Sequence, residues 1–191
     1  MKNQIQKPFL KWLSVFTISL LIISCTDPKR EDPKTVAEDH NDAKFDDNHE
    51  KDSKFLVEAA SINLNEIELS KLALQKASEN DVKNLAKMMV ADHTKSLEEV
   101  KALAAKKMVT LPTETPNEGL DDYKKLNEKS NTDFNKKYCE MMVDGHKDAV
   151  KKFETASNEA SDSEIKDWAT KTLPTLRTHL DHAMTCAEKY K

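Results

Sequence analysis

The sequence is poor in the residues on which several kinds of site depend. It has only two glycines, Gly119 and Gly145, so no glycine-rich loop is available to cradle a phosphate. The three cysteines form no Cys-x-x-Cys pair, and no Ser-His-Asp set can be assembled. The net charge of −4 gives no reason to expect nucleic-acid binding. We therefore expect neither nucleotide chemistry nor nucleic-acid binding, and no motif identifies an enzyme.

The residues that are abundant favour an all-α protein. Charged residues make up 34% of the 191-residue chain, and Ala, Lys, Glu and Leu are common. Such a composition is typical of amphipathic helices with solvated outer faces. The length suits one domain preceded by a shorter segment.

Long hydrophobic runs are scarce, and the one near the start is short. Residues 12–23 are almost wholly apolar and follow a lysine-containing start without acids. A spanning helix needs about 20 apolar residues, whereas a secretory signal needs a basic start and a shorter apolar core. The sequence therefore predicts a signal peptide over residues 1–24.

The end of this segment resembles the lipobox of bacterial lipoproteins. It consists of Ile22-Ile23-Ser24-Cys25, with a small residue before the cysteine. The resemblance implies that Cys25 is diacylated and becomes the first residue of the mature chain, which anchors the protein to a membrane of the cell envelope. Thr26 stands where an aspartate would retain the protein in the inner membrane, which favours the outer membrane. An ordinary signal peptide that happens to contain a cysteine is the alternative.

Residues 25–51 are acidic and contain two prolines, Pro28 and Pro33. They include too few apolar residues to offset the entropy lost on ordering, so we expect a disordered tether between the lipidated cysteine and a domain at residues 52–191.

Within that domain, apolar residues recur at helical spacing in four long segments, at about residues 52–78, 81–107, 132–156 and 162–190. The connection between the second and third segments contains Pro112 and Pro116 and a short helix at about residues 120–129. It is long enough to cross the whole bundle, which allows the second and third helices to run parallel. The prediction is a four-helix bundle with a long crossover.

Three histidines and one glutamate interrupt the apolar stripes. His93 and His146 each follow a Met-Val pair in the middle of a helix, and His179 lies on the stripe of the last segment, as Glu66 does on the first. Glu66 and His93 are equally distant from one predicted turn, and His146 and His179 from the other. We therefore expect each pair to be level within its hairpin, and all four residues to meet in one layer.

Cys139 and Cys186 are also equally distant from the second turn, and each lies seven residues from its histidine. They should face each other across the third and fourth helices. An exported domain meets an oxidising compartment, so we predict a Cys139–Cys186 disulfide. Two small buried cysteines that do not bridge are the alternative.

The ordered set of motifs resembles a family of uncharacterised bacterial exported domains, whose members are described as predicted outer membrane proteins. The motifs are Met-Val-x-Asp-His at His93, Met-Val-x-x-His at His146, and Leu173-Pro174-x-Leu176-x-x-His179. The resemblance covers about residues 52–190 and implies a ferritin-like fold and an envelope location, but no activity. The chain departs from the pattern at Gly145, where a second Asp-His pair would be expected.

Two hypotheses of function remain open. In the first, Glu66, His93, His146 and His179 bind zinc, copper or iron in the core, and Asp92 and Asp144 orient the imidazoles. The Glu-x-x-His pattern of di-iron bundles is absent. The histidines could equally be core residues bonded to a carboxylate or to the backbone.

In the second hypothesis the chain is a non-enzymatic envelope lipoprotein, a tethered bundle with a structural or stress-related role or one that binds an unknown protein partner. It accounts for the predicted lipid and for the missing catalytic motif. The sequence favours this second hypothesis, with metal binding as the alternative.

Overall fold

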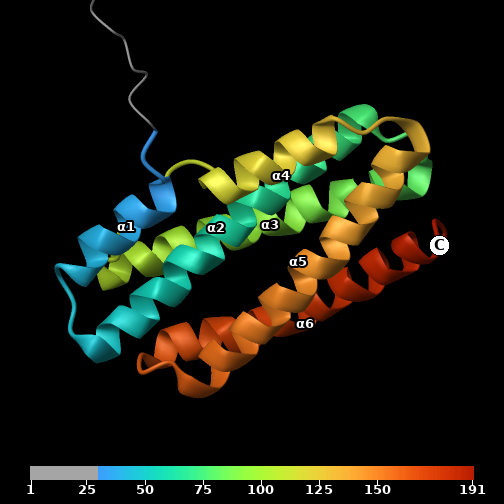
Figure 1. Cartoon of the computed structure of the whole chain (residues 1–191). Helices are drawn as coiled ribbons and strands as arrows, with labels where there is room; N and C mark the ends of the chain where they lie inside the picture. Colours follow the sequence, from blue (N-terminus) through green and yellow to red (C-terminus); the bar gives the residue numbers. More distant parts are fainter. Residues whose placement is uncertain (1–29) are drawn as a thin grey trace, which may run out of the picture. The chain divides into compact units, whose positions relative to one another are not determined.

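The computed structural model describes residues 30–191, and this part of the chain forms helices and no strand (Figure 1). The compact unit is Glu31–Lys191. Its helices are α1 (Pro33–Asp42), α2 (Asp47–Lys76), α3 (Asn80–Lys107), α4 (Asn117–Asn127), α5 (Asn131–Glu159) and α6 (Ser163–Glu188). The prediction of an all-α bundle is confirmed, and the four long helices match the four amphipathic segments to within a few residues, apart from the earlier start of α2.

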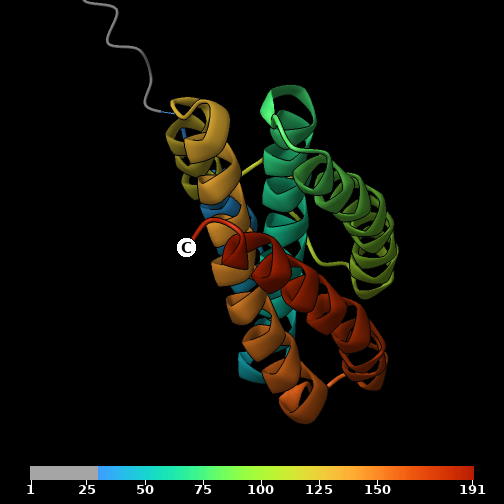
Figure 2. The same cartoon turned by 90° about the vertical axis from the view of Figure 1, so that its right-hand side faces the viewer.

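The bundle is built from two antiparallel hairpins, α2–α3 and α5–α6, which pack against each other (Figure 2). Asp52, near the start of α2, accepts hydrogen bonds from the backbone just beyond the end of α5. Ser70, near the end of α2, lies against Tyr138, near the start of α5, with 2.9 Å between the hydroxyl oxygens. These two helices are therefore antiparallel. Because α2 and α3 form an antiparallel hairpin, α3 and α5 run parallel, an arrangement that the length of the crossover allows.

The crossover leaves α3 at Met108, whose φ of 58° places it in the left-handed region that ends many helices. Residues 109–116 then lead to α4, which packs on α2 and α5 (Figure 1). The short helix begins at Asn117, three residues earlier than the pattern indicated.

The apolar stripes of the long helices meet in two clusters of buried side chains. One cluster includes Leu69, Met89 and Phe134, and the other includes Leu56 and Phe153. Polar side chains occupy the level between them, and three of these are the histidines of the sequence motifs.

The prediction that residues 25–51 form a disordered tether is wrong for most of residues 33–51, which are helical. Pro33–Asp42 forms α1, and α2 begins at Asp47. Asp32 caps α1 and Pro33 occupies its first turn, so the local start signal is present. Packing of α1 against the bundle stabilises the helix further. Ala37 is buried, and the Asn41 amide makes two hydrogen bonds with the backbone of Thr110.

The predicted signal peptide and Cys25 lie outside the described residues. Among the helices that are described, none combines the length and the apolar character needed to cross a bilayer.

Candidate metal centre

Three buried histidines from three helices face one another in the middle of the bundle. His93 comes from α3, His146 from α5 and His179 from α6, and each is at most 2% exposed. Nε2 of His146 lies 3.3 Å from Nε2 of His93 and 3.2 Å from Nδ1 of His179. One nitrogen of each ring lies within 4.8 Å of the others, so the three rings form a single cluster of candidate ligands.

The other nitrogen of each ring faces a hydrogen-bond acceptor. Nδ1 of His146 donates to the backbone carbonyl of Met142 at 2.9 Å, and Nε2 of His179 donates to the Asp92 carboxylate at 2.9 Å. Neither acceptor can donate a proton in return, so both ring nitrogens must carry hydrogen.

His93 is fixed in the same way by Asn63. Nδ1 of His93 lies 2.8 Å from Oδ1 of Asn63, whose amide nitrogen donates to the Ala59 carbonyl and to Ser96. Because the amide nitrogen is engaged on its other side, its oxygen faces the imidazole, and His93 donates from Nδ1.

These three bonds decide which atoms face the centre. A neutral imidazole has one N–H and one lone pair, and here each N–H points outward. Unprotonated Nε2 of His93, Nε2 of His146 and Nδ1 of His179 therefore converge with no proton to share. Ligands arranged tetrahedrally about 2.0–2.1 Å from a metal lie about 3.3–3.4 Å apart, which is close to the separations from His146.

Burial keeps the rings neutral. It lowers the pKa of His93 well below 6.5, and the neighbouring rings of His146 and His179 lower it further. Burial also lowers the pKa of His146 to about 4, with a smaller contribution from His179. The pKa of His179 is lowered by burial, although Asp92 opposes that shift. The lone pairs are thus available to a ligand at neutral pH.

Glu66, the fourth predicted ligand, lies beside this cluster and not within it. Its Oε1 is 3.7 Å from Nδ1 of His146, on the edge of the ring that faces away from the other two histidines. Its Oε2 is buried without a hydrogen-bond partner among the described residues, and burial raises its pKa to about 8. The expected four-residue layer therefore consists of three converging imidazoles with a carboxyl group behind one of them.

The two aspartates predicted to orient imidazoles differ in position. Asp92 bonds His179, which belongs to the opposite hairpin, whereas Asp144 is exposed and makes no described contact with a histidine. Asn63 fills the missing role, and the sequence analysis did not identify it. The one sequence feature that could have identified Asn63 is its position three residues before Glu66, which places both on the inner face of the same helix.

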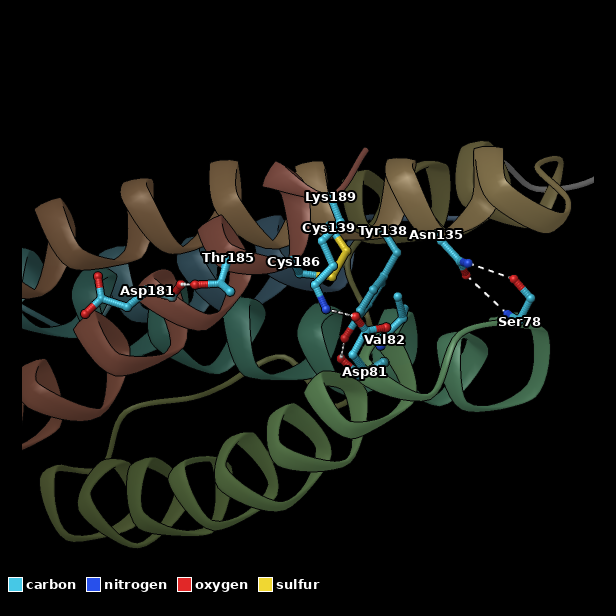
Figure 3. The surroundings of a disulfide bond; sticks show 11 residues. Ser78, Asp81, Val82, Asn135, Tyr138, Cys139, Asp181, Thr185, Cys186 and Lys189 are labelled. Carbon is cyan, nitrogen blue, oxygen red and sulfur yellow. Dashed lines mark hydrogen bonds and ion pairs between the residues drawn. A yellow bond between two sulfur atoms is a disulfide. The ribbon is translucent and has the colours of Figure 1, made fainter. Parts of the chain in front are cut away.

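The predicted Cys139–Cys186 disulfide is present and joins α5 to α6, with 5.7 Å between the Cα atoms (Figure 3). Next to it, Lys189 pairs with Asp81 of α3, so the same end of α6 is linked to both hairpins. Each cysteine lies two turns from a histidine of the cluster. The bond therefore holds α5 and α6 in the register that aligns His146 with His179.

Fold and site together define a helical bundle with a buried three-histidine cluster. The family model described as "Domain of unknown function (DUF4142)" matches residues 36–186, and the chain belongs to that family. No curated protein matches the chain. A solved structure, "CopM in the Cu(II)-bound form", has the same fold with a TM-score of 0.62 and 17% sequence identity, and the alignment covers 73% of this chain and 97% of that one.

Proposed function

We propose that this protein binds a transition-metal ion, copper or zinc, at the centre formed by His93, His146 and His179. The observation that carries the proposal is the set of acceptors on the outer nitrogens: Oδ1 of Asn63, the Met142 carbonyl and the Asp92 carboxylate. Three buried lone pairs converge, and each ring is held by an acceptor on its outer side.

The arrangement is unfavourable without a cation. Three nitrogen lone pairs within 4.8 Å of one another repel, and burial disfavours the imidazolium that could share a proton between two of them. A metal ion removes that repulsion and uses the outward hydrogen bonds as the supports that histidine ligands ordinarily have. Histidines that served only to fill the core would not need their lone pairs to face one another.

The donor set indicates the kind of metal. The inner atoms are all imidazole nitrogens, and the nearest carboxylate oxygens, those of Asp92 and Glu66, lie behind the rings. Imidazole suits zinc and copper, whereas magnesium, calcium and manganese prefer oxygen. Iron sites in helical bundles use several glutamates, which this centre lacks. The similarity of the fold to CopM in its Cu(II)-bound form supports copper.

Elemental analysis tests the proposal. Protein purified without a histidine tag is loaded with Cu²⁺ or Zn²⁺, passed over a desalting column and analysed for metal. We expect one ion per chain for the wild type, and less than about one tenth of that for His93→Ala and His146→Ala.

The matched control is His182→Ala, because His182 lies one helical turn from His179 on the exposed side of α6. This variant should keep the full metal content. Circular dichroism confirms that each variant is folded. A wild type that retains no stoichiometric metal, or triad variants that retain as much as His182→Ala, would contradict the proposal.

We further propose that the protein is a lipid-anchored component of the bacterial cell envelope. The Ser24-Cys25 pattern supports the anchor, and the disulfide fits an oxidising compartment outside the cytoplasm. In that location a buried histidine site would bind metal ions that enter from outside the cell. A protein partner remains a hypothesis of the sequence alone.

A further inference from the structure

A second polar site lies on the other side of His146. A cavity of about 380 Å³ opens between α2, α4 and α5, and Asn65 and Glu66 form part of its wall. Neither residue contributes an atom to the three-histidine cluster.

Two acceptor oxygens in this wall are unsatisfied. Oε2 of Glu66 and Oδ1 of Asn65 are buried, and neither has a hydrogen-bond partner among the described residues. Glu66 as a whole is only 4% exposed. A buried acceptor without a donor is unfavourable, and more so if it is charged. The wall therefore calls for an occupant that donates hydrogen bonds or carries positive charge.

Both glycines of the chain make room for the side chains of Glu66 and Asn65. A Cβ atom at Gly145 would lie 2.8 Å from Oε1 of Glu66, the other oxygen of that carboxyl group, and one at Gly119 would lie 2.9 Å from Oδ1 of Asn65. Any other residue at Gly145 would push the carboxyl group away, although glycine is unfavourable in the interior of a helix such as α5. The two glycines thus leave space for the carboxyl group and the amide in the wall.

The charges around the cavity favour a cation. Three of its four lysines are paired within the wall: Lys34 and Lys152 with Glu58, and Lys125 with Asp122. Besides Glu66, the wall contains two further acids with no ion pair among the described residues, Glu118 and Asp144, against a single such lysine, Lys137.

We propose that this cavity is a second cation site, in which the oxygens of Glu66 and Asn65 bind a hydrated divalent ion. Carboxylate and amide oxygens are the ligands that hard cations such as Mn²⁺ and Mg²⁺ prefer. Six waters occupy about 180 Å³ at roughly 30 Å³ each, so the cavity accommodates the ion with its hydration shell. The site goes beyond the proposed copper or zinc centre and does not depend on it.

The two glycines also provide the assay. Labelling with ¹⁵N-glycine gives two backbone amide signals from the whole chain, and both glycines line the cavity. Paramagnetic Mn²⁺ added at substoichiometric amounts should broaden both signals. The titration is run at about pH 8.5, above the pKa of about 8 that burial gives Glu66.

Glu66→Gln should weaken Mn²⁺ binding at least about tenfold, because it removes the buried negative charge with almost no change in shape. Asn65→Leu, which removes the second oxygen, should also weaken it. The matched control is Glu68→Gln on the same helix, which alters a carboxylate paired with Lys71 outside the cavity and should leave the titration unchanged.

The titration is repeated with one equivalent of Zn²⁺ and in His93→Ala, which separates the two sites. Broadening that persists in both confirms a site distinct from the histidines, even if the protein binds no Zn²⁺. The proposal is overturned if the glycine signals do not broaden, if Glu66→Gln and wild type titrate alike, or if Zn²⁺ or His93→Ala abolishes the effect.

Discussion

Nε2 of His179 donates to the carboxylate of Asp92 across the α3–α6 interface, with 2.9 Å between the two atoms. Asp92 comes from the helix of one hairpin and His179 from the other, so this bond crosses the bundle at the level of the cluster. Asp144 occupies the related position two residues before His146, yet it is exposed on α5. The two similar sequence motifs therefore contribute differently to the centre.

This difference gives the first prediction. Asp92→Asn should lower metal affinity about 10–100-fold, because an amide can donate to Nε2 and allow the proton to move to Nδ1, the atom that must bind the metal. Competition with a chromophoric chelator measures the affinity. Asp181→Asn, an exposed change on α6 outside the cavity between α2, α4 and α5, is the control and should bind as tightly as wild type. Equal affinities for the two variants would mean that Asp92 does not set the His179 tautomer.

The second prediction concerns the pH dependence of stability in the metal-free protein. His146 has a pKa of about 4 when folded and about 6.5 when unfolded, so the unfolded state binds more protons between these values and stability falls as pH falls. The full shift corresponds to roughly 3 kcal/mol, and His93 and His179 act in the same direction.

Glu66 affects the pH dependence of stability in the opposite direction. Its folded pKa of about 8 exceeds the unfolded value of 4.5, so the folded state binds the additional proton and stability falls as pH rises toward 8. Below pH 6.5 the three histidines outweigh this one glutamate. Urea unfolding should therefore show maximal stability near pH 7, with a decrease of roughly 0.5–1 kcal/mol by pH 9, because the loss from Glu66 exceeds the gain from the last histidine deprotonation in the unfolded state. Glu66→Gln should remove the alkaline decrease and steepen the rise in stability between about pH 4.5 and pH 7, and identical profiles for this variant and the wild type would refute the assignment.

The third prediction tests the disulfide. The bond closes a loop between cysteines 47 residues apart, so Cys139→Ala/Cys186→Ala should lose about 3–4 kcal/mol of unfolding free energy. Alkylation of the denatured, unreduced protein should modify neither Cys139 nor Cys186, whether or not Cys25 carries lipid. Modification of Cys139 and Cys186 would show that the bond does not form.

The fourth prediction addresses the anchor. Cells fed labelled palmitate should label the wild-type protein but not Cys25→Ala, because the thiol of Cys25 is the predicted acceptor. Asn158→Ala, an exposed change near the end of α5, serves as the control for expression and should label normally. Equal labelling of Cys25→Ala and wild type would exclude lipidation at this residue.

Symmetry about a turn made some long-range contacts predictable. In an antiparallel hairpin, two residues equally distant from the turn must lie level, so His146 was expected opposite His179 and Cys139 opposite Cys186. The same rule placed Glu66 level with His93, but the histidine bonds Asn63, one turn away on α2. Symmetry gives the level to within about a turn and does not give the direction of a side chain.

The segment before α2 shows the limit of composition. Residues 33–42 are polar and bury little apolar surface, so their composition predicted disorder. Their order depends on Asn41, which makes two hydrogen bonds with Thr110. Thr110 follows α3 and is therefore separated from Asn41 in the sequence by both α2 and α3. No local pattern reports a partner that distant.

The sequence by itself determined the four long helices, their polar and apolar faces, the crossover and the pairing of the two cysteines, because these follow from helical spacing and chain connectivity. Only the tertiary structure decided which ring nitrogens face inward, that Glu66 lies behind His146, and that Gly119 and Gly145 border one cavity. Those properties depend on how two hairpins rotate and pack against each other, and together they involve residues from five helices, α2 to α6.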